Sequence, residues 1–302
     1  MTLAHEVRQV ARGWRWTRRS LTPRSAEPFT PEPEPREFPT AWARTAAGCV
    51  AREVVQSYVL RPLVHHEIRP RVEGLDRLEE MRGPVVFVAN HASHLDAPLV
   101  LCSLPLRWRE RTAVGAAADY FFDARWRAAA TAIAFNAFPV ERRGGKQAGS
   151  TARDLLGDGW NLLLFPEGSR SPDGWMRTLR HGAARLCVDQ GVPAVPVALR
   201  GSHAAMPRGR SWPVPGRPRV AVRFGVPVHP RADERPRDLT ARITQGIART
   251  WHEEDADWWS SLRGEAEGTT PAATGPQAAD WRRKWETLRP LASRDPARVW
   301  RP

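Results

Sequence analysis

The hydrophobic positions between residues 67 and 263 fall in short runs that alternate with longer stretches of helical character. Several of the runs are apolar throughout, as in strands that are covered on both faces of a parallel sheet. The predicted strands are residues 84–89, 112–117, 160–165, 193–199 and 218–224, and the predicted crossover helices are residues 97–106, 122–134, 147–158 and 180–190. This alternation predicts an α/β domain with a largely parallel central sheet flanked by helices.

An amphipathic helix is predicted ahead of the first strand, over residues 42–60. Its apolar positions recur every fourth residue, its polar positions lie on another face, and Pro62 is expected to end it. The apolar positions are Trp42, Ala46, Val50, Val54 and Tyr58. We expect this apolar face to pack on the domain, or to share that role with contact to a membrane surface. A last helix, rich in Arg and Trp, is predicted over residues 236–263.

The two ends of the chain differ in composition from the middle. Residues 1–20 are basic and contain two tryptophans, and residues 21–40 contain six prolines, which predicts a stiff tether. Residues 264–279 are rich in Gly, Ala and Thr and predict a flexible linker, and residues 281–302 form a second basic segment with tryptophans. The expected organisation is a basic segment and tether at 1–40, a single catalytic-size domain at 41–263, and a linker and tail at 264–302, with disordered or peripheral tails.

Most of the net charge of +13 lies at these ends. Residues 1–20 carry five arginines and one glutamate, and residues 281–302 carry seven basic and two acidic side chains. A nucleic-acid-binding protein is therefore a distant alternative, because the excess charge lies outside the predicted domain.

Two classes of protein are disfavoured by what the sequence lacks. No apolar run reaches 18 residues and the first residues lack the pattern of a secretory signal, so we expect an intracellular protein that does not span a membrane. The three cysteines are far apart and form no CxxC pair, so neither a disulfide framework nor a zinc ribbon is expected.

The motif with the clearest chemistry is Asn-His-Ala-Ser-His-Leu-Asp at residues 90–96, directly after the predicted strand 84–89. Open parallel sheets place their ligand sites at the carboxyl ends of strands. A tight turn can bring Asp96, as the cap of the next helix, onto one ring nitrogen of His91. The other nitrogen can then accept a proton, and an imidazole with its ordinary pKa of about 6.5 suits a general base near neutral pH.

Other chemistries that such residues can serve fail on spacing. A metallohydrolase motif of the form His-x-His-x-Asp-His needs histidines where Ala92 and Ala97 stand, so no metal site is expected. The Gly-Gly-Lys run at residues 144–146 lacks both the Ser or Thr and the earlier Gly of a phosphate loop. The Gly-x-Ser-x-Gly elbow of a serine hydrolase does not occur.

A second motif, Phe-Pro-Glu-Gly-Ser-Arg-Ser, follows another predicted strand at residues 165–171. Gly168 and Ser169 suit a turn whose N–H and hydroxyl groups face a polar ligand. Glu167 can hold a hydroxyl, and Arg170 can hold a phosphate or Glu167 itself.

A third stretch, residues 138–145, leads from a short apolar run into a Gly-rich loop. It carries Arg142 and Arg143, and paired guanidinium groups at such a place predict an anion site.

With these motifs in this order, the chain resembles the glycerolipid acyltransferases, the family that includes 1-acylglycerol-3-phosphate and glycerol-3-phosphate acyltransferases. The family's first motif, a His followed by any four residues and an Asp, matches His91 and Asp96. Its third motif matches residues 165–171, with Ser169 in place of the commoner Thr. The resemblance covers about residues 42–230, and the combination of these two motifs is highly specific.

Two weaker motifs agree with the same family. Its second motif, an Arg after a short apolar run, looks like residues 138–142, with Glu141 where an Asp is more usual. Its fourth, a Pro inside an apolar strand, is similar to the surroundings of Pro196.

The resemblance implies an acyltransferase that moves a fatty acyl group to the free hydroxyl of 1-acylglycerol 3-phosphate, giving phosphatidic acid. His91, oriented by Asp96, would deprotonate that hydroxyl, with no covalent acyl-enzyme. The acceptor's phosphate and hydroxyl would be held by Arg142, Arg143, Glu167, Gly168, Ser169 and Arg170. Acyl-CoA or acyl-carrier protein is the implied co-substrate, and neither a metal nor another cofactor is implied.

The same reading accounts for the ends of the chain. A lysophospholipid acceptor lies in a membrane, and the basic, Trp-bearing ends together with the helix over 42–60 suit adsorption to an anionic membrane surface. We expect a cytoplasmic protein, peripheral on the inner face of the cell membrane, with no nucleic-acid partner. The main alternative keeps the fold and chemistry and changes the acceptor to glycerol 3-phosphate, another lysophospholipid or a glycolipid.

Overall fold

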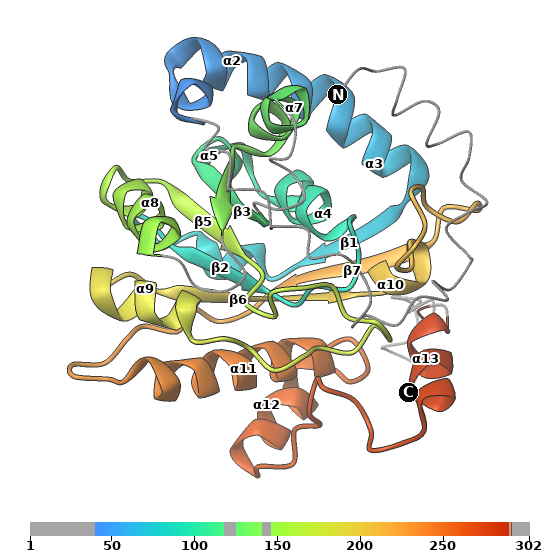
Figure 1. Cartoon of the computed structure of the whole chain (residues 1–302). Helices are drawn as coiled ribbons and strands as arrows, with labels where there is room; N and C mark the ends of the chain where they lie inside the picture. The colour runs from blue at the N-terminus through green and yellow to red at the C-terminus, as the bar shows by residue number, and fades with distance from the viewer. Residues whose placement is uncertain (1–39, 118–124, 141–145, 290, 292–302) are drawn as a thin grey trace, which may run out of the picture. The chain divides into compact units, whose positions relative to one another are not determined.

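The computed structural model describes residues 40–117, 125–140, 146–289 and 291. In these residues a seven-stranded sheet lies between layers of helices (Figure 1). Along the sheet the strands follow the order β1-β7-β6-β2-β5-β3-β4. Their bounds are β1 Arg69–Glu73, β2 Val86–Ala89, β3 Thr112–Ala117, β4 Ala137–Val140, β5 Asn161–Leu164, β6 Ala194–Arg200 and β7 Arg219–Phe224.

Five strands run in one direction and the two at one edge run in the other. β6, β2, β5, β3 and β4 are parallel neighbours, β7 is antiparallel to β6, and β1 is parallel to β7. The predicted, largely parallel sheet is confirmed, since the five predicted strands correspond to β2, β3, β5, β6 and β7. The hydrophobic pattern misses β1, a mostly polar edge strand, and β4, a four-residue strand that contains Pro139.

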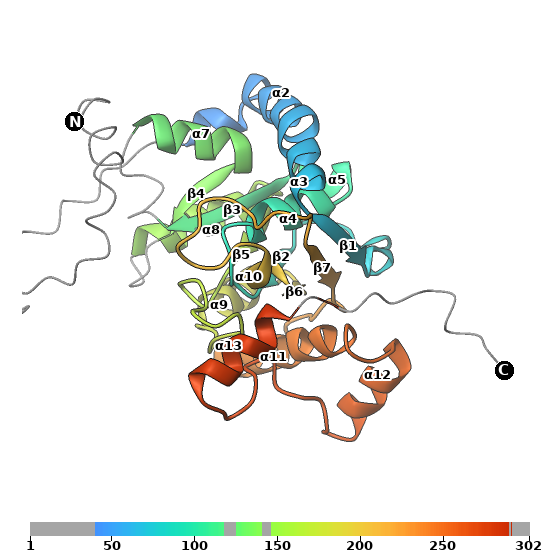
Figure 2. The ribbon, with the colours of Figure 1, turned by 90° about the vertical axis from the view of Figure 1, so that its right-hand side faces the viewer.

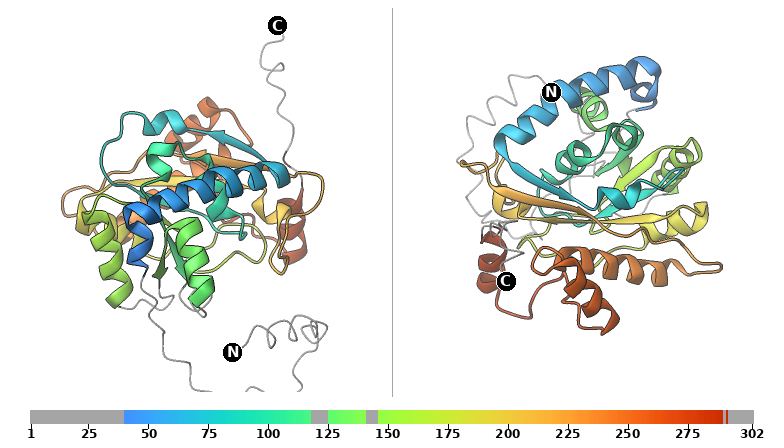
Figure 3. Two further views of the ribbon diagram at one scale, coloured as in Figure 1. Left: turned by 90° about the horizontal axis from the view of Figure 1, so that it is seen from above. Right: turned by 180° about the vertical axis from the view of Figure 1, so that it is seen from behind.

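Helices cover both faces of the sheet (Figure 3). In β2, Phe87 and Ala89 pack into the cluster under one layer of helices, and Val86 and Val88 into the cluster under the other. Burial on both faces explains why the strand sequences are apolar throughout. One layer holds α4 (Asp96–Ser103), α5 (Leu106–Arg109), α7 (Arg125–Phe135) and the helices before β1, and the other holds α8 (Lys146–Gly157), α9 (Gly182–Gln190) and α11 (Pro236–His252).

The helical segment before β1 is longer than predicted. It consists of a 3₁₀ turn η3 (Ala41–Arg44), α2 (Ala46–Val55), a π-helical turn η4 (Gln56–Leu60) and α3 (Arg61–Glu67). Pro62 does not end it, because the proline is the second residue of α3, in the first turn after the π turn. There the hydrogen-bond register changes, and the N–H of Arg61 donates to the carbonyl of Gln56.

The apolar face of this segment is turned to the solvent. Val50, Val54 and Tyr58 are 66%, 51% and 79% exposed, whereas the polar Arg52 and Gln56 are each 1% exposed. The expectation that the apolar face packs on the domain is therefore wrong. The polar face does so instead, because its side chains find hydrogen-bond partners in the interior.

The helix predicted over residues 236–263 is two helices, α11 and α12 (Trp258–Ala266). The break lies at Glu253 and Glu254, whose buried carboxylates pair with arginines at the edge of the sheet. Asp257 then starts α12 by accepting a hydrogen bond from the N–H of Ser260 at 2.7 Å. The arginines paired with the two buried carboxylates include Arg77 and Arg223.

The chain after α12 is folded against the domain where the sequence predicts a flexible linker over 264–279. Ala273 is buried, and its carbonyl accepts the N–H of Met176 at 3.1 Å. The helix α13 (Asp280–Leu288) follows and packs beside α10 (Ser202–Ala205) (Figures 1 and 2). The predicted domain limits stay predictions, and the basic ends at residues 1–39 and 292–302 lie outside the described residues.

Candidate active site

Two loops meet at the carboxyl ends of the neighbouring parallel strands β2 and β5. Residues 90–95 follow β2, and residues 165–181, which begin with the third motif, follow β5. Val88 near the end of β2 is paired with Leu164 at the end of β5. The backbone N–H of Ser171 donates to the carbonyl of His91 over 2.7 Å. The structure thus brings the first and third sequence motifs into contact.

The imidazole of His91 is paired with a buried carboxylate. His91 Nδ1 lies 2.9 Å from Oδ2 of Asp96, and the same oxygen accepts the backbone N–H groups of Ala92 and Ser93, each at 2.7 Å. An oxygen that accepts three hydrogen bonds is a carboxylate oxygen, so Nδ1 donates to it, and in the neutral ring Nε2 is the nitrogen with the lone pair. The His91 side chain is 21% exposed, and Asp96 is fully buried.

Asp96 is the first residue of α4, and its cap differs from the predicted one. Its carboxylate accepts N–H groups from the loop that precedes the helix, at Ala92 and Ser93. The loop is thereby closed into a tight turn around the carboxylate, which fixes the position of His91.

Two further contacts hold the ring and its loop. The ring of Phe165 stacks on the imidazole of His91, with ring centroids 4.4 Å apart and planes inclined by 30°. Asn90 ties the start of the loop to β6, since its amide donates to the carbonyl of Leu199 at 3.0 Å and accepts the N–H of Leu199 at 2.7 Å. The orientation of the imidazole is therefore fixed from both strands that flank β2.

Glu167 lies inside the second loop, and its side chain is 3% exposed. Oε1 accepts the N–H of His91 at 2.7 Å and Oε2 accepts the N–H of Arg177 at 3.0 Å. Burial raises the pKa of Glu167 to about 8, against the opposing effect of these two hydrogen bonds. This carboxyl group joins the two loops, which supports a positioning role, while the predicted contact with an acceptor hydroxyl stays a prediction.

Two exposed arginines that the sequence reasoning missed lie on the second loop. Arg177 donates to the hydroxyl of Ser169, and the guanidinium of Arg180 lies over Gly168, where it would be 3.0 Å from a Cβ. The φ of Gly168 is +74°, a conformation that favours glycine. Both arginines stand in a segment without regular secondary structure, where no hydrophobic period or motif marks them. The turn at 168–169, predicted to face a polar ligand, therefore carries two cations.

A third cation acts on the loop of residues 90–95. Burial and then the positive charge of Arg170 lower the pKa of His94 to about 4. Arg142 and Arg143 lie outside the described residues, and the anion site predicted there stays a prediction.

Comparison with known proteins gives the same family as these motifs. Residues 69–200 match the family model described as Acyltransferase. A 1-acyl-sn-glycerol-3-phosphate acyltransferase of Chlamydomonas reinhardtii is 32% identical over 165 residues, which are 53% of this chain and 48% of that protein. A chloroplastic 1-acyl-sn-glycerol-3-phosphate acyltransferase of Arabidopsis thaliana is 28% identical over 180 residues, 58% of this chain and 48% of that protein. The chain thus spans about half the length of these curated relatives.

A solved structure is similar to this chain in both fold and sequence. The 1-acyl-sn-glycerophosphate acyltransferase PlsC of Thermotoga maritima has a TM-score of 0.53 and 27% identity, and the match covers 68% of this chain and 84% of that one. Residues 69–200, which match the family model, contain the β2 and β5 loops with His91, Asp96 and Glu167. Over this region the chain is therefore similar to the glycerolipid acyltransferases.

Proposed function

We propose that the protein transfers a fatty acyl group from acyl-CoA or acyl-carrier protein to the free hydroxyl of 1-acylglycerol 3-phosphate, giving phosphatidic acid. The observation that carries the proposal is the imidazole of His91, whose Nδ1 is held 2.9 Å from the buried carboxylate of Asp96. The names of the relatives support the choice of acceptor and reaction.

In the proposed reaction His91 acts as a general base. Nε2 accepts the proton of the acceptor hydroxyl while the hydroxyl oxygen attacks the carbonyl carbon of the thioester. The C–S bond then breaks, and the imidazolium returns the proton to the departing thiolate, so that His91 is restored without an acyl-enzyme. Asp96 stabilises the imidazolium between these steps.

The cations of the second loop supply a place for the acceptor's phosphate. Arg177 and Arg180 flank the turn at Gly168 and Ser169, and Arg170 follows it in the chain. Guanidinium groups bind phosphate oxygens by charge-assisted hydrogen bonds, so a phosphate at this turn would direct the rest of the acceptor toward His91.

The first test is the release of free thiol from palmitoyl-CoA by the purified protein in detergent micelles. We expect release to depend on 1-acylglycerol 3-phosphate and to be at least about tenfold slower with 1-acylglycerol, because a hydrogen bond to a charged group contributes about 1.5–3 kcal/mol. Equal rates with the two acceptors would contradict recognition of the phosphate. Release that needs no acceptor would indicate a thioesterase, and release only with glycerol 3-phosphate or another lysophospholipid would assign that acceptor.

We further propose that the protein works as a peripheral protein at the cytoplasmic surface of the cell membrane, with the outer face of α2 and η4 in contact with lipid. In the described part of the chain no helix has the length and apolar character needed to cross a bilayer. Val50, Val54 and Tyr58 follow one another at intervals of four residues and are more than half exposed. Such a stripe, with a Tyr in it, is suited to the boundary between headgroups and acyl chains.

The double variant Val50→Glu, Val54→Glu tests this contact. We expect it to bind anionic phospholipid vesicles at least about tenfold more weakly, since it loses apolar area and places two negative charges beside anionic lipid. Vesicle co-sedimentation measures the loss. Val226→Glu is the matched control, because Val226 is 47% exposed and lies after β7, outside this face. Equal vesicle binding by the double variant and the control would contradict the proposed contact.

A further inference from the structure

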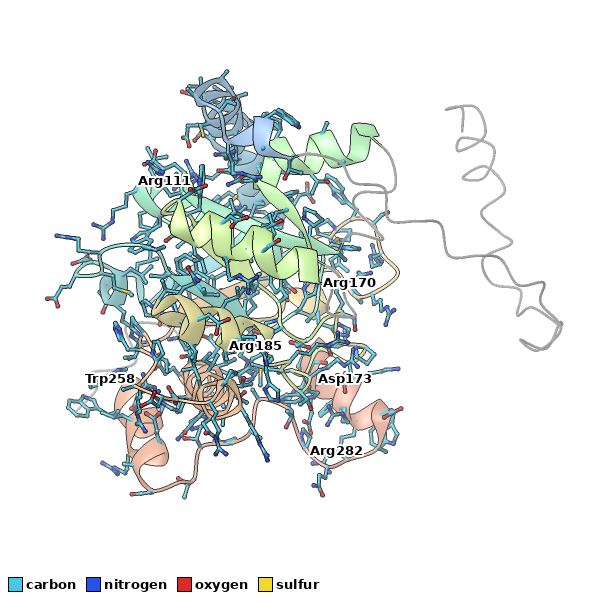
Figure 4. All side chains as sticks on the ribbon, turned by 60° about the vertical axis from the view of Figure 1, so that its left-hand side comes forward. Arg111, Arg170, Asp173, Arg185, Trp258 and Arg282 are labelled. Carbon is cyan, nitrogen blue, oxygen red and sulfur yellow. The ribbon has the colours of Figure 1, made fainter. Side chains whose placement is uncertain are left out.

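The helix α13 lies outside the 69–200 region that matches the family, yet it packs beside the active-site loops. One of its sides faces the domain and the other faces the solvent. The side chain of Arg283 is 22% exposed, whereas that of its neighbour Arg282 is 60% exposed. Figure 4 shows Asp173 next to α13, with Arg282 on the side of the helix turned away from the domain.

Two side chains of α13 donate hydrogen bonds to the same residue of the loop that follows β5. Nε of Arg283 donates to Oδ2 of Asp173 at 2.7 Å, and the hydroxyl of Thr287 donates to the backbone carbonyl of Asp173. The guanidinium of Arg283 is itself held by the carbonyls of Pro276 at 2.7 Å and Thr274 at 2.9 Å. Arg283 is thus a fixed group, since its position is set by three acceptors.

From Asp173 the contacts lead directly to the catalytic histidine. The other oxygen of Asp173, Oδ1, accepts the hydroxyl of Ser171 at 2.9 Å, and the N–H of Ser171 donates to the carbonyl of His91 at 2.7 Å. The hydroxyl of Ser171 also accepts the N–H of Gly174 at 2.9 Å, and Ser171 is 1% exposed. Three consecutive hydrogen bonds therefore connect Arg283 with the backbone of His91.

A second set of contacts packs α13, the loop and α10 together behind the catalytic loop. A Cβ on Gly174 would come within 2.8 Å of Thr287 and 3.0 Å of His203, so the three segments meet without a gap. Burial lowers the pKa of His203 on α10, against the opposing effect of the backbone of Ala92, so His203 lies beside the residue that follows His91. A movement of α13 would therefore reach residues 91 and 92 by two routes.

We propose that Arg283 and Thr287 are positioning residues for His91, acting through Asp173 and Ser171. The proposal rests on the acyl transfer proposed above, because it concerns the geometry of the proton acceptor in that reaction. Displacement of a catalytic group by about 1 Å lowers a rate by up to about 10²-fold, whereas substrate binding at other contacts is retained.

The test compares two neighbouring arginines of one helix. We expect Arg283→Met to lower kcat about tenfold and to leave the KM for 1-acylglycerol 3-phosphate within about twofold, since the lost contact orients a reacting group and not the bound substrate. Arg282→Met removes the same charge from the solvent side of α13. Within the described part of the chain the Arg282 side chain pairs only with Glu286 of the same helix, so this variant should leave kcat unchanged. Arg283→Lys, which keeps the charge beside Asp173, should recover part of the lost kcat.

A double-mutant cycle with Asp173→Asn separates positioning from general stability. If Arg283 acts through Asp173, the double variant should lose no more kcat than Asp173→Asn alone. The proposal would be overturned if the double variant lost kcat by the product of the two single losses. Equal kcat values for Arg282→Met and Arg283→Met would also overturn it. So would a loss of kcat that matches the unfolded fraction measured by urea denaturation.

Hydrogen–deuterium exchange provides a readout that does not depend on the reaction. We expect Arg283→Met, but not Arg282→Met, to speed exchange in the peptide that contains residues 90–96, whose N–H groups are bonded to Asp96 and Glu167. Unchanged exchange in both variants would overturn the positioning role. A wild-type protein that is inactive with 1-acylglycerol 3-phosphate but shows this difference in exchange would refute only the proposed acceptor.

Discussion

We expect the His91→Ala variant to lose acyl transfer by about 10²–10⁴-fold in kcat, because it has no group in this position that can accept the proton of the acceptor hydroxyl. The variant should stay folded. The backbone N–H of residue 91 still donates to Glu167, and Asp96 still accepts the N–H groups of Ala92 and Ser93. Thiol release with 1-acylglycerol 3-phosphate gives kcat, and urea denaturation gives the free energy of unfolding.

His94 is the control for this experiment, because it is the other imidazole of the same loop. Burial, together with the charges of Arg170 and His91, lowers the pKa of His94 to about 4, so that it is a weak proton acceptor near neutral pH. We expect His94→Ala to keep kcat within about tenfold of the wild type. An active His91→Ala variant beside an inactive His94→Ala variant would assign the base to His94.

The placement of His91 and Asp96 could be predicted from the sequence because both rules behind it are local. A continuous apolar run predicts a strand buried on both faces, and the residues that follow such a strand lie at the edge where parallel sheets bind ligands. The four residues between the two side chains allow a tight turn. The structure has this turn closed on Oδ2 of Asp96.

The orientation of the helices before β1 could not be predicted, because it depends on partners that are distant in the sequence. Arg52 donates to the carbonyl of Ala43 at 2.7 Å, and its guanidinium lies 5.6 Å from the ring centre of Trp160. Gln56 donates to the carbonyl of Ala134 at 2.8 Å. Once these polar groups are satisfied, their burial costs little, and the hydrophobic pattern no longer decides which face turns inward.

The role of α13 could not be predicted from the sequence, for the same reason. Arg283 and Asp173 are 110 positions apart, and neither stands in a hydrophobic pattern or a motif with defined chemistry. Composition marks the region around Arg283 as basic and Trp-bearing, which is typical of a tail. Only the folded chain shows that one arginine of this region faces a carboxylate of the active-site loop.

The second large effect that we expect concerns Glu167 and the stability of the protein as a function of pH. Burial raises the pKa of this carboxyl group in the folded protein to about 8, from an ordinary value of 4.5. Between these two values the folded protein holds a proton that the unfolded chain has released. The free energy of unfolding therefore decreases as the pH rises through this window, by up to about 1.4 kcal/mol per pH unit from this group.

The Glu167→Gln variant isolates that contribution, because glutamine does not titrate and all other groups are common to both proteins. Its NH₂ group cannot accept a backbone N–H, so one of the hydrogen bonds from His91 and Arg177 is lost, at a cost of about 1–3 kcal/mol. At pH 5 the wild type should therefore be the more stable protein. As the pH rises to 8 its advantage should shrink and then reverse. Only the wild type has a carboxyl group that is protonated in the folded protein and ionised in the unfolded chain, and this difference lowers its free energy of unfolding as the pH rises.

Urea denaturation of both proteins at pH 5, 6, 7 and 8 measures this difference in free energy of unfolding. A difference that stays constant over the window would contradict a neutral carboxyl group, and would show that the two N–H donors hold Glu167 as an anion despite its burial. The distinction bears on the site, because Glu167 accepts the backbone N–H of His91 and an anion there would add a second negative charge next to Asp96. A neutral Glu167 leaves Asp96 as the carboxylate that pairs with the imidazole, in line with its proposed part in the reaction.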